Sequence, residues 1–439
     1  MKKYTTAMIV LALIAAALLF AFASESEPID SLFHAPAQDG GDGQIWNAIE
    51  KGAEGEYTLK TPTDGSHRSA LVYTDLNDDG KNEVVAFYST VKSGDSICMQ
   101  ILSQTDSGWV SSTGVNSEFN EIKQVEFADL DGDGKNEVVV GWGLQKNNIM
   151  QQISVYRFDE KNDLLTQIFD SKYTSFGLFD INSDEQTEIA VVSADYSIEP
   201  PVQKLALFSY SADKFRKISE TDIDPSITTV SGLSFDVNRR TASSRIYVDG
   251  YVADGLLSTE LLVFDIDSSN LRRCYIDGET FCTLTKRSIN VFCSDINNDG
   301  IVEIPTKRNI EHGTGSFSLI EWKSLQRDEM KTVCYYFDNR ENGYYFCIPS
   351  VIEDNSYPVL SEDGKRLCFY ESDFSMQSTD DPQLLLELFI DGSGEMSLIS
   401  TLYRYIDSHK GNSFYCRITE RGSILGLTKK LVASSVIFV

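Results

Sequence analysis

Four short acidic segments of the 439-residue chain carry residue types that bind a hard metal ion. One of them, DLDGDGKNE from Asp129 to Glu137, holds three aspartates and a glutamate in nine residues. The others run from Asp75 to Glu83, from Asp180 to Glu188 and from Asp295 to Glu303. They share the pattern D-x-[DN]-x-D-G-x-x-E, and only the third segment lacks the glycine. Because carboxylates packed this closely repel one another, the pattern indicates that a cation belongs among them.

Calcium is the ion that fits this pattern of residues. We number the segments loops 1, 2, 3 and 5 in chain order, because an eroded copy, loop 4, lies between the last two. Ca²⁺ takes six to eight oxygen ligands, and a curled loop supplies them from alternate positions, with a glycine at the sharp turn. We predict ligands at positions 1, 3, 5 and 9, together with the backbone carbonyl at position 7 in three loops. The predicted ligands are Asp75, Asn77, Asp79, Lys81, Glu83, Asp129, Asp131, Asp133, Lys135, Glu137, Asp180, Asn182, Asp184, Glu188, Asp295, Asn297, Asp299, Ile301 and Glu303.

Two copies depart from the pattern. Glu185 stands at the glycine position of loop 3, so that this turn is either strained or open, and calcium binding there is left undecided. Loop 4 keeps Asp236 and Asn238 but has Arg240 in place of the third acid, so we predict that it binds no metal. For the intact loops the alternative is a solvated Asp-Gly turn between strands, and three copies in register favour the calcium site over it.

The leading aspartates recur about every 55 residues, which indicates a repeat architecture. The closing acid stands at position nine rather than twelve, and β-branched segments such as EVVVGW follow it, so the loops are not EF-hands. Four strand-like segments separate loop 1 from loop 2: residues 84–90, 97–103, 108–114 and 121–127. Four short strands in each repeat are typical of a propeller blade. We therefore predict a mainly β protein with a β-propeller of about five four-stranded blades over residues 57–331.

In its loops and their spacing, this region resembles the FG-GAP/VCBS repeat proteins, the calcium-blade propellers related to the integrin α head. The resemblance covers residues 57–331 and is carried by copies that keep register. It implies that calcium is bound structurally, and that one face of the propeller recognises proteins or glycans.

Three further regions flank the predicted propeller. Residues 1–23 combine two lysines with an apolar run ending in Ala21-Phe22-Ala23, which predicts a signal peptide or a membrane anchor. Residues 24–56 indicate a linker and then a short helix at QIWNAIEKGA. Residues 332–439 lack acidic loops and predict a separate α+β domain with a short helix at STLYRYIDSHK, a sixth blade being the alternative. We expect an extracytoplasmic protein, secreted or anchored, that contacts the membrane only through its N-terminal segment.

Charge and motifs narrow the classes of function. The chain has 66 acidic and 38 basic residues and a net charge of -28, which argues against nucleic acid as a partner. The sequence contains no nucleophile elbow, zinc-protease helix or phosphate loop, and its four histidines are widely scattered. The eight cysteines form no C-x-x-C pair; burial as small hydrophobic residues and pairing in one or two disulfides both remain open.

We expect a monomeric, non-catalytic, calcium-binding module that attaches to a protein or glycan at the cell surface. An envelope-attached scaffold or sensor is the alternative, and a glycan-cleaving enzyme is less favoured. An exposed aromatic cluster on one face would separate binding from scaffolding. The segments FGLF (176–179) and GWG (141–143) are candidates, although both also fit core packing.

Overall fold

Antiparallel β-sheet makes up most of the computed structural model, which describes residues 42–112, 114–145, 147–199, 201–238, 242–312, 315–326, 329–372, 383–392 and 402–439. The predicted signal peptide or anchor, and the first part of the predicted linker, lie outside these residues. Within the described part, every helix is too short or too polar to span a bilayer.

The described elements form six successive sheets of four or more strands. Helix α2 (Asp42–Ala53) precedes sheet 1, which contains β1 (Tyr57–Leu59), β2 (Leu71–Thr74), β3 (Glu83–Thr90), β4 (Cys98–Thr105), β5 (Gly108–Ser111) and β6 (Val115–Asn116). Sheet 2 contains β7 (Glu121–Ala128), β8 (Glu137–Leu144), β9 (Asn147–Asp159) and β10 (Leu164–Lys172), with a 3₁₀ turn, η2 (Glu160–Asn162), before β10. Sheet 3 contains β11 (Ser175–Phe179), β12 (Glu188–Asp195), β13 (Val202–Ser211) and β14 (Lys214–Asp222). Sheet 4 contains β15 (Ile227–Asn238), β16 (Ser243–Val252), β17 (Leu257–Asp265) and β18 (Asn270–Arg273).

A short connection leads to the last two sheets. It holds the hairpin β19 (Tyr275–Ile276) and β20 (Glu279–Thr280) and the helix α3 (Phe281–Thr285). Sheet 5 contains β21 (Ile304–His312), β22 (Gly315–Gln326), β23 (Glu329–Asn339), η3 (Arg340–Asn342) after β23, β24 (Tyr344–Cys347) and the final strand β30 (Val436–Phe438). Sheet 6 follows helix α4 (Ser350–Glu353) and contains β25 (Ser356–Leu360), β26 (Arg366–Glu371), β27 (Leu384–Asp391), β28 (Arg404–His409) and β29 (Asn412–Ile418). Helices α5 (Glu420–Ile424) and α6 (Lys429–Ser435) complete the chain before β30.

The predicted four-stranded units are present. Sheets 2, 3 and 4 each have four antiparallel strands that pair in chain order. Sheet 1 contains the same run from β2 to β5, with β1 added beside β3 and β6 beside β4. In sheet 5 the strand expected before the acidic loop is reduced to a single bridge between Ser294 and Glu303.

The sheets pack face to face, and alternate residues of one strand enter different cores. In β8, Val138 and Val140 pack against sheet 1, while Val139 packs against sheet 3. In β16, Ile246 faces sheet 3 and Tyr247 faces sheet 5. Because both faces of these strands are covered, they read as continuous apolar runs rather than as alternating ones. The molecule therefore has a series of cores between neighbouring sheets.

The two ends of this series are covered by different elements. At the start, Ile45 and Ile49 of α2 pack on Val84 and Ala86, the face of sheet 1 that no earlier sheet covers. The predicted helix is thus confirmed at Asp42–Ala53. At the other end, sheet 6 packs on sheet 5 through a core that includes Phe346 and Phe369.

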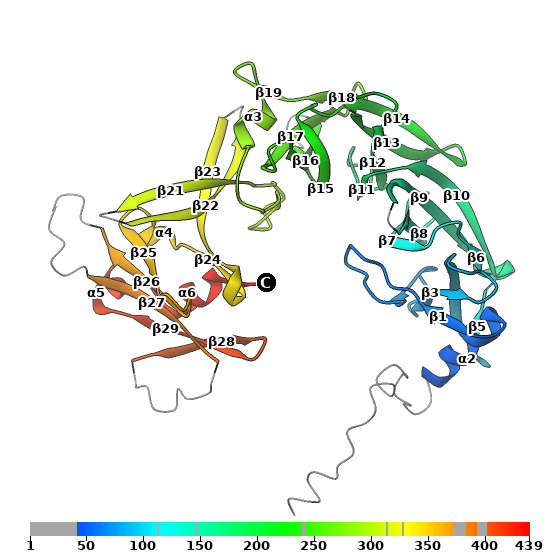
Figure 1. Cartoon of the computed structure of the whole chain (residues 1–439), viewed down its shortest axis with the longest axis horizontal. Coiled ribbons are helices and arrows are strands. Elements are labelled where there is room, and N and C mark those ends of the chain that lie inside the picture. Colours follow the sequence, from blue (N-terminus) through cyan, green and yellow to red (C-terminus); the bar gives the residue numbers. More distant parts are fainter. Residues whose placement is uncertain are drawn as a thin grey trace, which may run out of the picture.

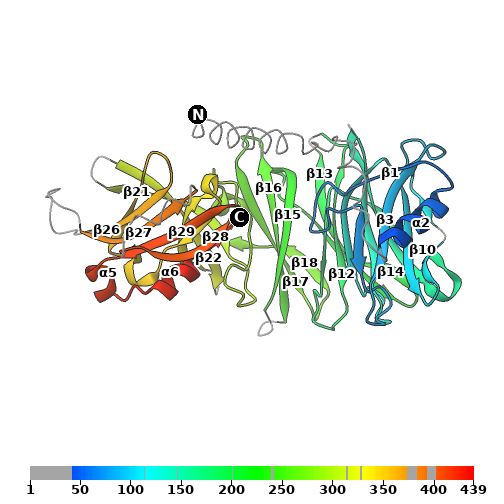
Figure 2. The ribbon, with the colours of Figure 1, turned by 90° about the horizontal axis from the view of Figure 1, so that it is seen from below.

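Figure 1 shows sheets 1 to 6 following one another around an open arc, with α2 and sheet 1 at one end and sheet 6 at the other. Figure 2, turned by 90°, shows α2 and the strands of sheet 6 at opposite ends of the row. No core cluster or strand pairing among the described residues joins sheet 1 to sheet 6. A closed ring of five blades is therefore not what the described residues form.

Two details of the C-terminal region differ from the sequence prediction. The predicted domain boundary at 331/332 falls inside β23, and the final strand β30 returns to pair with β24 in the same sheet. The predicted helix at STLYRYIDSHK is wrong, because residues Arg404–His409 form strand β28 beside β29. Long-range strand pairing decides both points, and local sequence pattern does not report it.

Candidate metal sites

The four acidic loops share one backbone geometry. In loop 2 the N–H of Leu130 donates to Glu137 Oε2 at 2.9 Å, and the N–H of Gly134 donates to Asp129 Oδ2 at 2.9 Å. The corresponding bonds in loops 1, 3 and 5 measure 2.8–3.2 Å. The closing glutamate is also the first residue of β3, β8 and β12, so the strand fixes its position relative to the loop. The sequence pattern therefore encodes one repeated structure.

The turn at position six requires a left-handed backbone in every copy. The φ angle is 80° at Gly80, 84° at Gly134 and 80° at Gly300. Glu185 of loop 3 adopts the same region at 69°, which costs a residue with a Cβ about 1 kcal/mol or more. Its N–H still donates to Asp180 Oδ2, at 3.2 Å. Loop 3 is thus closed and strained, which decides between the two alternatives for this turn.

The closing glutamates are the most buried of the predicted ligands. Glu83, Glu137, Glu188 and Glu303 are only 1–2% exposed. Burial raises the pKa of Glu137, Glu188 and Glu303 to about 7, and nearby aspartates add to the effect. Burial likewise raises the pKa of Glu83. Each loop thus places a desolvated carboxylate beside further acids, an environment that a bound cation would stabilise.

The side chains of the predicted ligands converge in loops 2, 3 and 5. In loop 2, one oxygen each from Asp129, Asp131 and Glu137 lie within 4.8 Å of one another. In loop 5 the side-chain nitrogen of Asn297 donates to Asp299 Oδ2 at 3.0 Å and to Glu303 Oε1 at 3.5 Å, which brings the side chains of positions 3, 5 and 9 together. Loop 3 repeats this arrangement at 3.0 and 3.3 Å. A donor set of carboxylate, amide and carbonyl oxygens fits Ca²⁺ and does not fit a soft metal.

At position seven, the residues of the intact loops also hold the turn. The N–H groups of Lys81, Lys135 and Ile301 donate to the aspartate at position five, at 2.8–3.0 Å. Position five thus accepts a backbone bond with one oxygen and keeps its other oxygen for the interior of the loop.

An arginine that the sequence did not predict reaches loop 2 from a neighbouring strand. Arg157, in β9, contacts Asp131 Oδ2, and its Nε lies 3.6 Å from Glu137 Oε1. The only sequence signal was its place in the strand that pairs with β8, and this required the register of the sheet.

Loop 4 contains an internal ion pair. Asp236 is 3% exposed and accepts hydrogen bonds from Arg245 Nε at 2.6 Å, the Tyr247 hydroxyl at 2.9 Å and the Val302 N–H at 3.0 Å. Arg240, which was predicted to supply the cation here, lies outside the described residues. Arg245 is the guanidinium that the structure pairs with Asp236.

Successive loops contact each other along one edge of the arc. Asn136 of loop 2 donates its N–H to Leu76 O at 3.0 Å and its side-chain amide to Asp75 O at 2.9 Å. A Cβ on Gly132 would lie 2.8 Å from the Gln186 amide of loop 3. Loop 3 accepts a bond from Ser244 at Ile181 O, and Val302 of loop 5 donates to Asp236 of loop 4. The loops therefore form a continuous row.

Other clusters of ionisable groups are internally paired. Asp224, Glu260 and Cys282 lie together, and Arg273 donates to Glu260 Oε1 at 2.9 Å while also contacting Asp224. This guanidinium occupies both carboxylates, so the pair does not resemble the acid and base of a glycosidase.

The aromatic segments proposed for a binding face belong to the interior. Trp142 is 1% exposed, and Phe176 is buried between sheets 2 and 3. Phe179 is partly buried and stacks on Phe235, with 4.9 Å between ring centroids. The core-packing alternative therefore holds for both segments.

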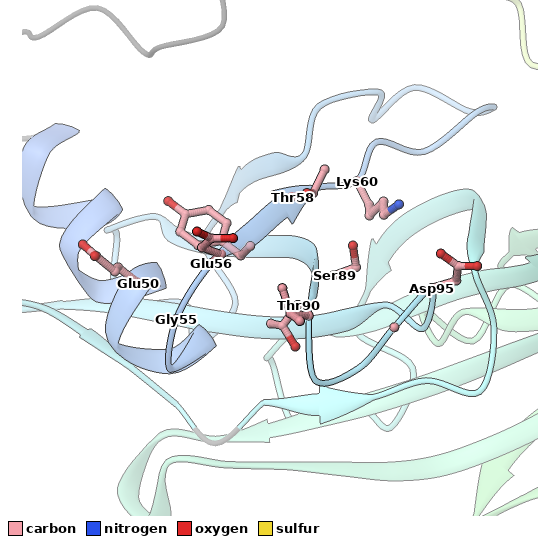
Figure 3. A pocket seen from close by; sticks show the side chains of 11 residues that line it. Glu50, Gly55, Glu56, Thr58, Lys60, Ser89, Thr90 and Asp95 are labelled. Carbon is pink, nitrogen blue, oxygen red and sulfur yellow. The ribbon is translucent and has the colours of Figure 1, made fainter.

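A hollow of about 870 Å³ lies beside α2 and the β1–β3 edge (Figure 3). Glu50, Glu56 and Asp95 line it together with Lys60, and hydroxyl groups such as that of Ser89 complete the wall. Three carboxylates against one ammonium make this surface unfavourable for an anion.

Comparison with known proteins gives limited likeness. No family model matches the chain, and no curated protein matches it. Among solved structures, it is similar to the Dos1 propeller (11% identity, TM-score 0.31), over 78% of this chain and 66% of that one, just under two thirds. It is similar to a rhamnogalacturonan lyase of Bacillus licheniformis (11%, TM-score 0.30), over 72% and 70% of the two chains. It is also similar to a β-1,3-galactosidase (12%, TM-score 0.28), over 83% and 77%. At such TM-scores, the fold described above rests on the chain's own strand pairing.

Proposed function

We propose that loops 1, 2, 3 and 5 are calcium sites that stabilise a propeller-like protein of the FG-GAP/VCBS type. The observation that carries this proposal is the recurrence of one nine-residue geometry in four separate sheets, each with its closing glutamate buried. The aspartates at positions 1 and 5, the residue at position 3, the carbonyl at position 7 and the closing glutamate would hold the ion. Bound calcium would supply positive charge that offsets the repulsion among these carboxylates.

We further propose that the chain is an exported, monomeric module that binds a protein or glycan at the cell surface. The row of loops supports this proposal, because calcium at about 1 mM is available outside the cell and sites of this type bind at about 10⁻⁴–10⁻³ M. The envelope-attached scaffold or sensor remains the second candidate. A catalytic role has less support, because the buried carboxylate pair described above is bridged by Arg273.

Calorimetric titration of calcium into the protein, together with thermal melts with and without chelator, tests the metal proposal. We expect three or four ions per chain, and about 1.4 kcal/mol of stabilisation for each site at tenfold excess over its Kd. Asp133→Ala, which removes the position-5 ligand of loop 2, should remove one ion. Ser107→Ala, at an exposed turn of sheet 1, is the matched control and should leave the count unchanged. A count of zero, with melts that ignore the chelator, would reduce the loops to acidic turns.

A glycan array, probed with the calcium-loaded protein and with the chelated protein, tests the module proposal. Calcium-dependent binding to a defined group of glycans is the expected result. Equal binding by both forms would separate the ligand surface from the metal sites. An array without signal, combined with pull-down of envelope components, would favour the scaffold.

A further inference from the structure

Loop 2 differs from the other three acidic loops at two places that change the charge around its predicted ligands. At position three it has Asp131, whereas the others have an asparagine: Asn77, Asn182 and Asn297. The second difference lies on the neighbouring strand, opposite the closing glutamate. There sheet 2 has Arg157, whereas the other sheets have a serine: Ser103, Ser209 and Ser324.

Strand register establishes that these four residues are equivalent. In sheet 2, Val138 pairs with Tyr156, so the next step of the ladder sets Glu137 opposite Arg157. The same single step from the pairs Val84–Leu102, Ile189–Phe208 and Ile304–Lys323 sets each other closing glutamate opposite its serine. Arg157 and the three serines therefore occupy equivalent positions in their sheets.

The Arg157 side chain reaches into the loop. Its Nη2 contacts Asp131 Oδ2, its Nε lies 3.6 Å from Glu137 Oε1, and both acids are at most 4% exposed. The Tyr210 hydroxyl of β13 lies 3.0 Å from the same Nη2, and the guanidinium carbon lies 5.5 Å from the centre of the Tyr210 ring. Sheet 3 thus holds the arginine from one side and loop 2 holds it from the other.

The two differences cancel in charge. The Asn/Ser loops each present three carboxylates at positions 1, 5 and 9. Loop 2 presents four, and the guanidinium of Arg157 offsets the additional one. Loop 4 goes further in the same direction, because Arg245 pairs with its leading acid, Asp236. In both repeats a guanidinium occupies carboxylates that would otherwise face a metal ion.

We propose that Arg157 is an internal counter-ion that competes with calcium for Asp131 and Glu137, and that loop 2 is therefore weaker than an intact Asn/Ser loop. This inference rests on the proposed calcium binding. A serine leaves the interior of the loop free for an ion, whereas the guanidinium must give up its contacts before the two carboxylates can bind one. The loop with the most carboxylates at its predicted ligand positions is thus the one where an ion has the least access to them.

Calcium titration of the full-length protein and of three variants tests the inference. Arg157→Ser should strengthen one site by about tenfold or more, since it removes a positive charge next to two ligands. Asp131→Asn combined with Arg157→Ser should give loop 2 the affinity of loops 1 and 5. The reverse change, Ser103→Arg, places a guanidinium opposite Glu83 and should weaken or abolish the site in loop 1. If Ser103→Arg does not fold, Arg157→Lys serves instead and should lie between the wild type and Arg157→Ser.

Melts in chelator make failure of the two proposals distinguishable. Without calcium, Arg157→Ser should melt at a lower temperature than the wild type, because four carboxylates then lack a counter-ion, and added calcium should reverse the loss. If Arg157→Ser binds calcium with the same isotherm as the wild type, this inference is wrong while calcium binding stands. If no variant binds calcium, both proposals are wrong, and a lower melting temperature of Arg157→Ser would then show only that the ion pair stabilises the fold.

Discussion

At the scale of the residue, each acidic loop needs a left-handed backbone at position six, as it also does at position four. Glycine supplies it at position six in three loops, and Glu185 adopts it in the fourth. A Cβ on Gly80, Gly134 or Gly300 would meet nothing within 4 Å, so the requirement for glycine comes from the φ angle and not from lack of space. The strain at Glu185 therefore comes from its φ angle.

Replacing Glu185 with glycine should stabilise the protein. Relief of the left-handed conformation is worth about 1 kcal/mol. The measurement is urea unfolding in chelator, so that metal binding does not contribute. Gly134→Ala is the converse control and should destabilise loop 2 by a similar amount. Equal stability of Glu185→Gly and the wild type would show that the turn is not strained in solution.

Asp236→Ala should destabilise the fold without changing the number of calcium ions. Removing this acid leaves Arg245, which is 12% exposed, without its charged partner, and it leaves the Tyr247 hydroxyl and the Val302 N–H without their acceptor. The loss of one partner of a buried pair costs about 3 kcal/mol. Chemical denaturation measures the loss, and calorimetry counts the ions. A variant as stable as the wild type would contradict the assigned role of the pair.

The geometry of the acidic loops could be predicted from the sequence largely because the predicted ligands of each loop lie within nine consecutive residues. Asp129 and Glu137 belong to the same loop, so the residue types and their spacing are enough to predict the geometry of the loop. Arg157 could not be predicted, because it arrives from another strand and its relation to Glu137 exists only once the register is known. Arg245 was missed for a related reason: pattern alignment placed the cation at Arg240, five residues away.

At the scale of the element, α2 covers the face of sheet 1 that no neighbouring sheet covers. Its apolar residues Ile45, Ala48 and Ile49 recur at helical spacing, and they cover the face of sheet 1 that would otherwise be open to water. Apolar positions of this kind are legible in sequence, which is why the helix was predicted. The surface that the helix covers could not be predicted, because the segment QIWNAIEKGA carries no information about which part of the chain it packs against.

Shortening Ile49 to alanine should therefore destabilise the protein, since this side chain is 0% exposed. Removing a buried isoleucine in this way costs about 2–5 kcal/mol. Asn47→Ala, on the exposed side of the same helix, is the matched control and should change stability little. Thermal and urea unfolding of both variants provide the comparison. An equal response of the two would mean that α2 does not protect sheet 1.

At the scale of the whole molecule, the C-terminal region belongs to the architecture of the repeats. Sheet 5 takes β21 to β23 from the last repeat, β24 from beyond the predicted boundary and β30 from the end of the chain. The repeated sheets could be predicted from the sequence, because each repeat contains its own recognisable loop and strand segments. The predicted domain boundary falls inside β23, because sheet 6 has no acidic loop although it packs on sheet 5.

A chain that ends at Lys331 should not form a stable protein. It would lack most of β23 and the whole of β24 and β30, and Leu319 of β22 would lose the core that it shares with sheet 6. We expect such a truncation to aggregate or to bind a hydrophobic dye, whereas the full-length protein should not. Size-exclusion chromatography of both chains gives the answer. A monodisperse, cooperatively melting truncation would restore the boundary at 331/332.

The covered ends of the arc have a consequence for how such a protein can change over evolutionary time. A closed propeller ties its curvature to its number of blades, so that gain or loss of one blade disturbs every interface in the ring. Here the first sheet meets a helix and the fifth meets a differently built sheet, and each internal interface involves only neighbours. As in stacked repeat proteins, whose end units are specialised, a duplication or deletion of one repeat would leave both end pieces usable. Lineages carrying this chain's end pieces are thus expected to vary in length by whole repeats of about 55 residues.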